Sequence, residues 1–252
     1  MSNTGRPITL VTGGSRGIGA ATVLRLAQAG HDVAVGYLED EESARGVASA
    51  ATAHGVRALP VRGQVADPDD VDRMFATVAA ELGPVTGLVN NAGITAHLGN
   101  LADTPVAVIR QVVEVNLLGA LFCARRAAAT MSTDRGGGGG AIVNVSSVAA
   151  ATGSPGEYVH YAAAKAGVET LTVGLARELA GQGVRVNTVA PGIVRTDIHA
   201  GAGDPGRPDR LSSRIPLGRP GEPDEVAPAI VWLLGPEAGY VTGATIRVSG
   251  GL

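Results

Sequence analysis

One pair of residues has the types and the spacing of an acid–base couple. Tyr161 is followed four positions later by Lys165, the only lysine of the chain, since 19 of the 20 Lys and Arg residues are arginines. On a helix, residues i and i+4 lie on one face, so the phenol and the ammonium would share one space. An ammonium about 4 Å from a phenolate is worth about 4 kcal/mol at an effective dielectric near 20. That energy equals roughly three pKa units, which would bring the tyrosine toward the range of a general acid and base.

The helix that carries this pair is predicted over residues 155–179. Ser154, Pro155 and Glu157 fit a capping box, with serine at the N-cap, proline in the first turn and glutamate at N3. The same tyrosine–lysine spacing also occurs in exposed helix pairs without any function. The spacing alone therefore leaves both interpretations open.

A second candidate site is the glycine-rich turn after the first predicted strand. Residues 12–19 read Thr-Gly-Gly-Ser-Arg-Gly-Ile-Gly and open a helix. Glycines at these positions let the backbone turn sharply and approach a pyrophosphate, whose charge lies at the helix N-terminus. A purely structural turn is the alternative, but the strand–turn–helix context favours dinucleotide binding.

The end of the second strand bears on the choice of dinucleotide. An acidic residue there normally binds a free ribose 2′-hydroxyl, but this chain has Gly36, Tyr37 and Leu38. Arg16, inside the glycine-rich turn, could reach a 2′-phosphate with its guanidinium. Both features favour NADP(H) over NAD(H). Glu39 argues the other way, because it would repel a phosphate unless it faces solvent.

Short β-branched runs alternate with longer helical patterns along the chain. Strands are expected at residues 8–12, 32–35, 58–61, 88–90, 141–145, 184–189 and 245–248. Their near-continuous hydrophobicity is typical of a parallel sheet covered by helices on both faces. Asp67-Pro68 and Thr104-Pro105 each place a capping residue before a first-turn proline and predict two helix starts. The segment of about residues 197–217, rich in Gly, Pro, Arg and Asp, interrupts the alternation and is a candidate lid or binding loop.

Composition narrows the class of protein. A chain of 252 residues with 45% hydrophobic and 17% charged residues fits one globular α/β domain over residues 1–252. A net charge of −3 without a basic run argues against nucleic acid as a partner. No apolar stretch is expected to span a membrane, and residues 1–6 are polar and lack a signal-peptide core. The single cysteine cannot form an internal disulfide, and the five histidines show no metal-ligand spacing. We expect a soluble cytoplasmic protein without a metal site.

Together these residues resemble the short-chain dehydrogenase/reductase family over essentially the whole chain. The resemblance is strongest to the branch of 3-oxoacyl-carrier-protein reductases and glucose-dehydrogenase-like enzymes. Its ordered motifs are the Thr12–Gly19 turn, Asn90-Asn91-Ala92-Gly93, Asn116 in Val115-Asn116-Leu117, Ser146-Ser147, Tyr161 with Lys165, and Pro191-Gly192. Six motifs in order make the match specific. It implies a Rossmann fold with a doubly wound, seven-stranded parallel sheet.

The resemblance also implies four catalytic residues. Tyr161 would be the general acid in carbonyl reduction and the general base in alcohol oxidation. Lys165 would lower the pKa of that phenol and hold the nicotinamide ribose hydroxyls. Ser147 would bind the substrate oxygen, chosen over Ser146 because the family usually uses the second serine of such a pair. Asn116 would hold a water that links Lys165 to solvent.

A larger set of residues would bind the cofactor. These are Gly13, Ser15, Arg16, Gly17, Ile18, Gly19, Tyr37, Gln64, Val65, Asn91, Ala92, Gly93, Tyr161, Lys165, Pro191, Gly192, Ile193 and Thr196. One position departs from the family, which usually has aspartate before valine after the third strand, where this chain has Gln64 and Val65. A glutamine carbonyl can still accept the hydrogen bond of the adenine amino group.

The implied activity is interconversion of a small-molecule ketone and a secondary alcohol by hydride transfer, in a homotetramer or homodimer. A non-catalytic NAD(P)-binding regulator on the same scaffold is the alternative, since fold does not fix function. The sequence leaves the roles of two features open. Tyr158 would line the pocket or pack within its helix. The charged residues of the irregular segment would bind an anionic substrate or face solvent; they are Asp204, Arg207, Asp209, Arg210 and Arg214.

Overall fold

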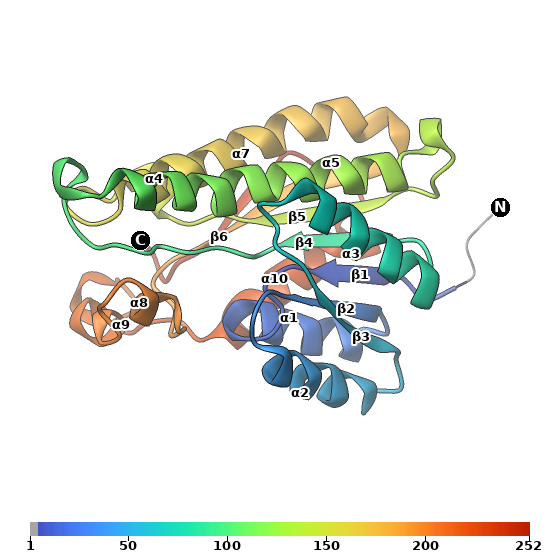
Figure 1. Ribbon diagram of the computed structural model, residues 1–252, viewed down its shortest axis with the longest axis horizontal. Coiled ribbons are helices and arrows are strands. Elements are labelled where there is room, and N and C mark those ends of the chain that lie inside the picture. Colours follow the sequence, from blue (N-terminus) through green and yellow to red (C-terminus); the bar gives the residue numbers. More distant parts are fainter. Residues whose placement is uncertain (1–4) are drawn as a thin grey trace.

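The predicted parallel sheet is confirmed. The structure, a computed structural model, describes residues 5–252, so the first four residues of the polar N-terminal segment lie outside it. Within the described residues, seven strands form one parallel sheet in the order β3-β2-β1-β4-β5-β6-β7 (Figure 1). The strands are β1 (Ile8–Val11), β2 (Asp32–Tyr37), β3 (Ala58–Arg62), β4 (Gly87–Asn90), β5 (Gly140–Val145), β6 (Val184–Pro191) and β7 (Thr245–Val248). Each begins and ends within two residues of its predicted limits.

Helices cover both faces of the sheet, because its central strands are apolar on both sides. One layer consists of α1 (Gly17–Gln28), α2 (Glu41–Thr52) and α10 (Pro223–Leu234) (Figure 1). On the other side lie α3 (Pro68–Glu81), α4 (Val106–Val113), α5 (Gly119–Met131) and α7 (Val159–Leu179). Two apolar cores result, one containing Leu26 and Ile230 and the other containing Met74 and Met131.

Shorter helices connect these elements. They are α6 (Ala149–Thr152), α8 (Ile198–Gly201), α9 (Arg207–Arg210), the 3-10 turns Leu101–Asp103, Thr133–Arg135, Ala180–Gln182, Ser212–Arg214 and Pro236–Ala238, and the π-helical turn Glu114–Leu118. The π-helical turn joins α4 to α5. Both α8 and α9 belong to the irregular segment 197–217, which lies beside the main body in Figure 1.

The strand order creates a crevice at one edge of the sheet. β1 is hydrogen-bonded to β2 on one side and to β4 on the other, so the chain winds away from β1 in both directions. In open parallel sheets, ligands bind outside the carboxyl ends of the strands at such a reversal. The loops after β1 and β4 therefore flank the expected ligand site.

The helix that carries the tyrosine–lysine pair begins later than predicted, and the capping box is wrong. α7 starts at Val159, not at residue 155. Ser154 and Gly156 have left-handed backbones, with φ of 45° and 74°. The Ser154 carbonyl accepts a hydrogen bond from the Tyr158 amide at 3.0 Å, which closes a turn ahead of the helix. A serine in that conformation does not cap the helix through its side chain.

The other two predicted helix starts have different outcomes. Asp67 caps α3, and its carboxylate accepts a hydrogen bond from the Asp69 amide at 2.9 Å, as predicted. Thr104 does not cap α4, because its hydroxyl donates to the Asn100 carbonyl at 3.0 Å and Pro105 occupies the N-cap position. That prediction was wrong.

One helical run bears on the expectation about membranes. The helical run Val106–Met131 is long and apolar enough to cross a membrane by length and composition alone, with a mean hydropathy of 1.7. Its buried side chains Cys123 and Met131 belong to the core beneath α5. Core helices of soluble proteins pass the same test of length and composition.

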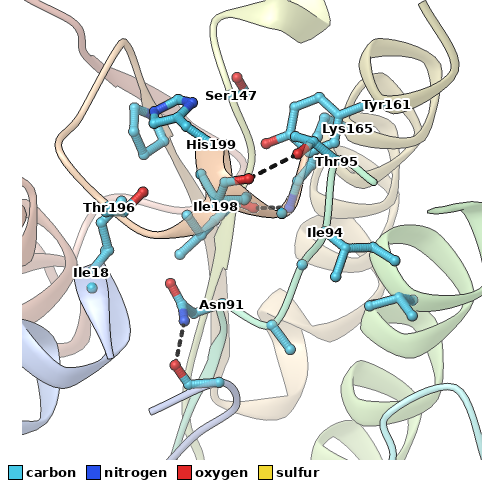
Figure 2. Close-up of a pocket in the computed structure, with 18 of the residues that line it drawn as sticks. Ile18, Asn91, Ile94, Thr95, Ser147, Tyr161, Lys165, Thr196, Ile198 and His199 are labelled. Atoms are coloured by element: carbon cyan, nitrogen blue, oxygen red, sulfur yellow. Dashed lines mark hydrogen bonds between the residues drawn. The ribbon is translucent and has the colours of Figure 1, made fainter. Parts of the chain in front are cut away.

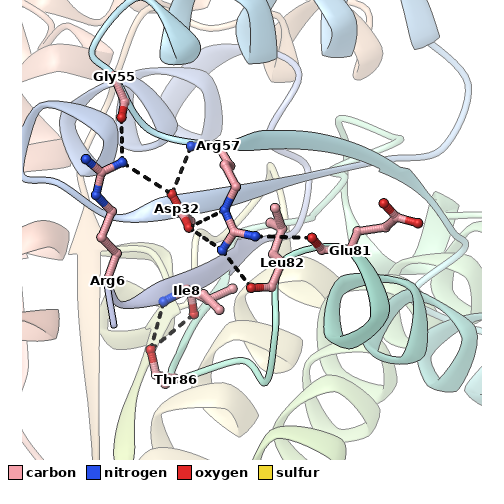
Figure 3. A network of polar contacts seen from close by, with 8 residues as sticks. All are labelled: Arg6, Ile8, Asp32, Gly55, Arg57, Glu81, Leu82 and Thr86. Atoms are coloured by element: carbon pink, nitrogen blue, oxygen red, sulfur yellow. Dashed lines mark hydrogen bonds and ion pairs between the residues drawn. The ribbon is translucent and has the colours of Figure 1, made fainter. Parts of the chain in front are cut away.

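A polar network ties the amino ends of the strands together (Figure 3). Asp32, at the start of β2, is buried and accepts three hydrogen bonds from Arg57, at 2.6 to 2.8 Å. The Arg57 guanidinium also donates to the carbonyls of Glu81 and Leu82 at the end of α3. This network therefore joins β2, the chain before β3 and α3 at the edge opposite the crevice.

Candidate active site

A cleft with a volume of ≈ 980 Å³ lies at the carboxyl ends of the central strands. Ser147, after β5, and Tyr161 and Lys165, on α7, line one end (Figure 2). The glycine-rich turn after β1 lines the same cleft. Segments distant in the sequence thus meet at the edge that the strand order indicates.

The glycine-rich turn is held by the loop after β4. The Thr12 hydroxyl accepts hydrogen bonds from the amides of Asn91 and Ala92, at 3.0 and 3.1 Å. The Asn91 side chain donates to the carbonyls of Thr12 and Gly13, each at 3.0 Å. These bonds fix the turn, in which Gly13 has a left-handed φ of 62°.

The start of α1 fits a diphosphate. A Cβ at Gly19 would lie 2.1 Å from the Gly13 carbonyl oxygen, so only glycine permits this close packing. The first turn of α1 contains no acidic residue, and Arg16, at the N-cap, is exposed. The positive end of the helix is thus free of carboxylates, which favours a bound anion. The residues present therefore fit a dinucleotide.

Lys165 is buried and bonded to the sheet. Its ammonium donates a hydrogen bond to the Val145 carbonyl at 2.8 Å and lies 5.7 Å from the centroid of the Tyr161 ring. Burial lowers the pKa of Lys165 from 10.5 to about 8. Arginine would not substitute well here, because its guanidinium group is permanently charged and larger than an ammonium.

The phenol of Tyr161 differs from the expectation in its electrostatics. Burial raises the pKa of Tyr161 to about 12, and a hydrogen bond to Ser147 opposes that rise. The spacing of Tyr161 and Lys165 predicted a lowered pKa, through the charge of the ammonium. That prediction was wrong for this geometry, because loss of hydration outweighs the nearby charge in a buried phenol.

The two serines after β5 have separate roles. The single hydroxyl hydrogen of Ser146 has two acceptors within reach on α7, the Glu169 carboxylate at 2.9 Å and the Lys165 carbonyl at 3.2 Å. The Ser147 hydroxyl accepts a bond from the Ala149 amide at 3.1 Å. The same hydroxyl also bonds to the Tyr161 phenol, which places Ser147 beside the predicted acid–base residue.

Asn116 lies in the π-helical turn and is almost fully buried. Its side-chain amide donates to the carbonyls of Ile94 and Val112, both at 2.8 Å, and accepts from the Ile94 amide at 3.2 Å. A Cβ at Gly93 would lie 2.6 Å from the Asn116 oxygen and 3.4 Å from the Lys165 ammonium. Asn116 therefore positions the loop after β4 next to Lys165.

Comparisons with known proteins bear on this geometry. Residues 13–252 match a family model described as "Enoyl-(Acyl carrier protein) reductase". The chain is 48% identical, over 97% of its length and 99% of the relative, to the uncharacterized oxidoreductase YgfF of Escherichia coli (strain K12). It is 40% identical, over 96% of both chains, to the 3-oxoacyl-[acyl-carrier-protein] reductase FabG of Staphylococcus aureus. A short-chain dehydrogenase from Burkholderia cenocepacia J2315, solved in complex with NADP, superimposes with a TM-score of 0.89 at 36% identity over 97% of each chain. The chain belongs to the short-chain dehydrogenase/reductase family.

As a short-chain dehydrogenase/reductase, the protein is an oxidoreductase that uses a nicotinamide dinucleotide. Of the predicted site residues, all but Gly19 and Asn116 line the cleft. Gly19 instead packs closely against the Gly13 carbonyl, and Asn116 bonds to the Ile94 backbone. Gln64 lines the cleft where the family usually has aspartate. Its backbone N–H donates a hydrogen bond to the Asp70 carboxylate at 2.8 Å.

The charged residues of segment 197–217 are mostly paired. Asp209 binds Arg195 at 2.6 Å, and Asp204 binds Arg210. Arg207 is buried and forms an ion pair with Glu157. Arg214 is the exception: it is exposed, lines the cleft and has no ion pair within residues 5–252.

Several cleft contacts were missed by the sequence analysis. The Thr95 hydroxyl donates to the Ile198 carbonyl at 3.1 Å (Figure 2). Behind it, the His160 ring contacts the Thr95 carbonyl at 3.2 Å. His199 lines the cleft, and Glu157 pairs with segment 197–217. The irregular composition of that segment pointed to the right region, but it did not indicate these partners.

Proposed function

We propose that this oxidoreductase reduces a ketone to a secondary alcohol with NADPH, and catalyses the reverse oxidation. The proposal rests on one observation: Ser147, Tyr161 and Lys165 line the same cleft as the glycine-rich turn. When bound, the nicotinamide supplies or accepts the hydride. The protein side chains then have to orient the carbonyl and to move one proton.

Each side chain has a role in that reaction. Ser147 donates a hydrogen bond to the substrate oxygen as negative charge develops on it. Tyr161, protonated at neutral pH because burial raises its pKa to about 12, gives its proton to that oxygen. Lys165 would hold the ribose hydroxyls of the nicotinamide. Both amide hydrogens of Asn116 are engaged with the carbonyls of Ile94 and Val112, so its part is to hold the loop after β4 next to Lys165 and not to bind a water through that amide. In alcohol oxidation the same phenol accepts the proton.

The preference for NADP(H) is supported by the rim of the cleft. Arg16 is exposed beside the turn, and Tyr37 takes the place of an acidic residue. The Asp40 carboxylate, which the sequence analysis did not consider, accepts a bond from the Ser43 amide at 2.9 Å and caps α2. It is thus occupied, and Arg16 lowers its pKa further. Glu39 is exposed on the same rim.

The remaining assignments concern the whole protein. We propose a single cytoplasmic domain over residues 1–252, with segment 197–217 as the substrate loop, assembled as a homotetramer or homodimer. Leu118, Val173 and Trp232 support assembly, since these large apolar side chains are 36 to 40% exposed on the helical layers. Sedimentation velocity distinguishes a monomer, which would contradict assembly, from both oligomers.

The proposed reaction is tested by oxidation of NADPH and NADH across a panel of ketones and 3-oxo esters. Turnover with NADPH, and its loss in Tyr161→Phe with dinucleotide binding retained, is the expected result. A panel without turnover, although the dinucleotide binds, would contradict the proposal and favour a regulator.

A further inference from the structure

Three buried polar atoms lie on residues that line the cleft and have no hydrogen-bond partner in residues 5–252. They are the Tyr158 phenol oxygen, His199 Nδ1 and Arg207 Nε. The three side chains are only 3%, 7% and 9% exposed. A buried polar atom left unpaired costs about 1–3 kcal/mol, and such atoms are rare in native proteins. Three of them in one cleft indicate a site built for a ligand.

The cluster adjoins the reacting phenol. The ring of Tyr158 lies edge-on to that of Tyr161, with centroids 6.1 Å apart, and the Arg207 guanidinium lies 4.9 Å from the Tyr158 ring centroid. Burial raises the pKa of Tyr161 and lowers that of His199; the Arg207 charge opposes the first shift and adds to the second. Figure 2 shows the His199 ring at the end of the cleft that holds Ser147 and Tyr161.

The three atoms divide into two donors and one acceptor. Burial raises the pKa of Tyr158, so the phenol keeps its proton and can donate it. Arg207 Nε always carries a hydrogen. His199 Nε2 lies 3.0 Å from the Val194 carbonyl oxygen, so that nitrogen carries the proton. Burial lowers the pKa of His199, which leaves Nδ1 as a free acceptor.

The charges around the cluster balance. Arg207 is paired with Glu157, and Arg210 is paired with Asp204. Arg214 also lines the cleft without an ion pair in residues 5–252, but it is exposed. A group buried beside Tyr158, His199 and Arg207 finds no unpaired cation among the four paired residues, so a neutral polar group fits better there. A hydroxyl group can accept two hydrogen bonds and donate one, which matches two donors and one acceptor. A carbonyl or ester oxygen only accepts, and it would leave His199 Nδ1 unpaired.

We propose that Tyr158, His199 and Arg207 form a second polar subsite that binds a hydroxyl group next to the reacting carbonyl. The preferred substrates are then hydroxyketones and the matching diols. This inference rests on the proposed function, because it assumes that a ketone reacts at Tyr161.

The test compares two ketones of equal size with NADPH. 3-Hydroxybutan-2-one carries the hydroxyl, whereas 3-methylbutan-2-one has a methyl group in its place. We expect kcat/KM to be at least about 10-fold higher for the hydroxyketone, because a site built to bond a hydroxyl rejects an analogue that lacks it. Methyl 3-oxobutanoate, with an ester carbonyl, should fall below the hydroxyketone.

Two variants and a control locate the effect. Tyr158→Phe removes one donor, and His199→Gln removes the Nδ1 acceptor while its amide nitrogen can still donate to the Val194 carbonyl. Each should lower the ratio of the two kcat/KM values by about 5-fold or more. Tyr240→Phe removes a phenol from a fully exposed tyrosine and should leave the ratio unchanged.

The outcomes separate this inference from the proposed function. Ketone turnover with a ratio near one, or a ratio that neither variant changes, overturns the subsite and leaves the reductase function intact. A higher kcat/KM for methyl 3-oxobutanoate than for the hydroxyketone also overturns it. Turnover of no ketone at all overturns the proposed function and the subsite together. Should Tyr158→Phe fail to fold, His199→Gln decides the question.

Discussion

At the amino ends of the strands, the buried Asp32 carboxylate accepts three hydrogen bonds from Arg57, whose guanidinium also satisfies two carbonyls of α3 (Figure 3). At the carboxyl ends, Tyr158, His199 and Arg207 keep buried polar atoms without partners within the described chain. Lys165 is buried there with one carbonyl as its hydrogen-bond partner. The network of Asp32 and Arg57 thus satisfies its buried polar groups, whereas three residues of the cleft each keep one without a partner in residues 5–252.

Because of this difference, we expect substitutions at the two edges to change different properties, stability or activity. Satisfied buried polar networks stabilise a fold, and removing one partner is costly. Unsatisfied or desolvated groups lower stability and persist where function requires them. Substitutions at the amino edge should therefore lower stability, and those at the carboxyl edge should lower activity instead.

Apart from removal of the reacting phenol itself, the largest expected effect on activity is that of Lys165→Met. We expect kcat/KM for the best ketone to fall about 10²- to 10⁴-fold, because the variant removes the ammonium beside the acid–base residue. A steady-state assay with NADPH measures this. A loss smaller than 10-fold would contradict the expectation that substitutions at the carboxyl edge lower activity.

The same residue predicts a pH dependence of stability. The pKa of Lys165 is about 8 in the folded protein and 10.5 as the unperturbed value, so the unfolded state binds more protons between these limits. The wild-type free energy of unfolding should therefore rise with pH from about 8 toward 10.5. Denaturant unfolding between pH 7.5 and 9.5 should show this rise in the wild type and a weaker one in Lys165→Met. Equal slopes would contradict the account.

At the opposite edge, Asp32→Asn should lower the free energy of unfolding by about 1–3 kcal/mol, because Arg57 loses its charged partner. Its kcat/KM should change less than about 2-fold, since Asp32 lies far from the cleft residues in the fold. Asp72→Asn is the matched control: Asp72 pairs with Arg126 at 3.4 Å but is 54% exposed, and such surface pairs contribute little. Equal destabilisation by the two variants would argue against a special role for the network.

The smallest effect is a change in dinucleotide affinity, expected for a substitution at the rim of the cleft. Arg16→Ala should weaken NADPH binding about 5- to 10-fold, because an exposed charge-assisted contact contributes about 1 kcal/mol. NADH binding should change less than about 2-fold. Arg45→Ala, which removes an exposed arginine paired with Glu41, is the control. If the two dinucleotides weaken equally, Arg16 binds the shared diphosphate instead of the 2′-phosphate.

The strands and the position of the cleft could be predicted because their signals are local. β-branched runs set the strands, and the glycine-rich turn directly follows β1. The start of α7 could not be predicted, because a capping pattern in the sequence does not reveal the left-handed backbones of Ser154 and Gly156. The pKa of Tyr161 depends on burial, which spacing along a helix does not report. The ion pair of Glu157 with Arg207 joins residues 50 positions apart, so no local pattern indicates it.

The most direct test measures activity and stability together in one variant, Tyr161→Phe. We expect kcat/KM to fall about 10³-fold or more, while the free energy of unfolding falls by no more than about 0.5–1.5 kcal/mol. The change in stability should be this small because the phenol is neutral at neutral pH and the variant removes only its hydrogen bond to Ser147. A variant that loses stability but keeps its turnover would contradict the central claim that Tyr161 serves chemistry.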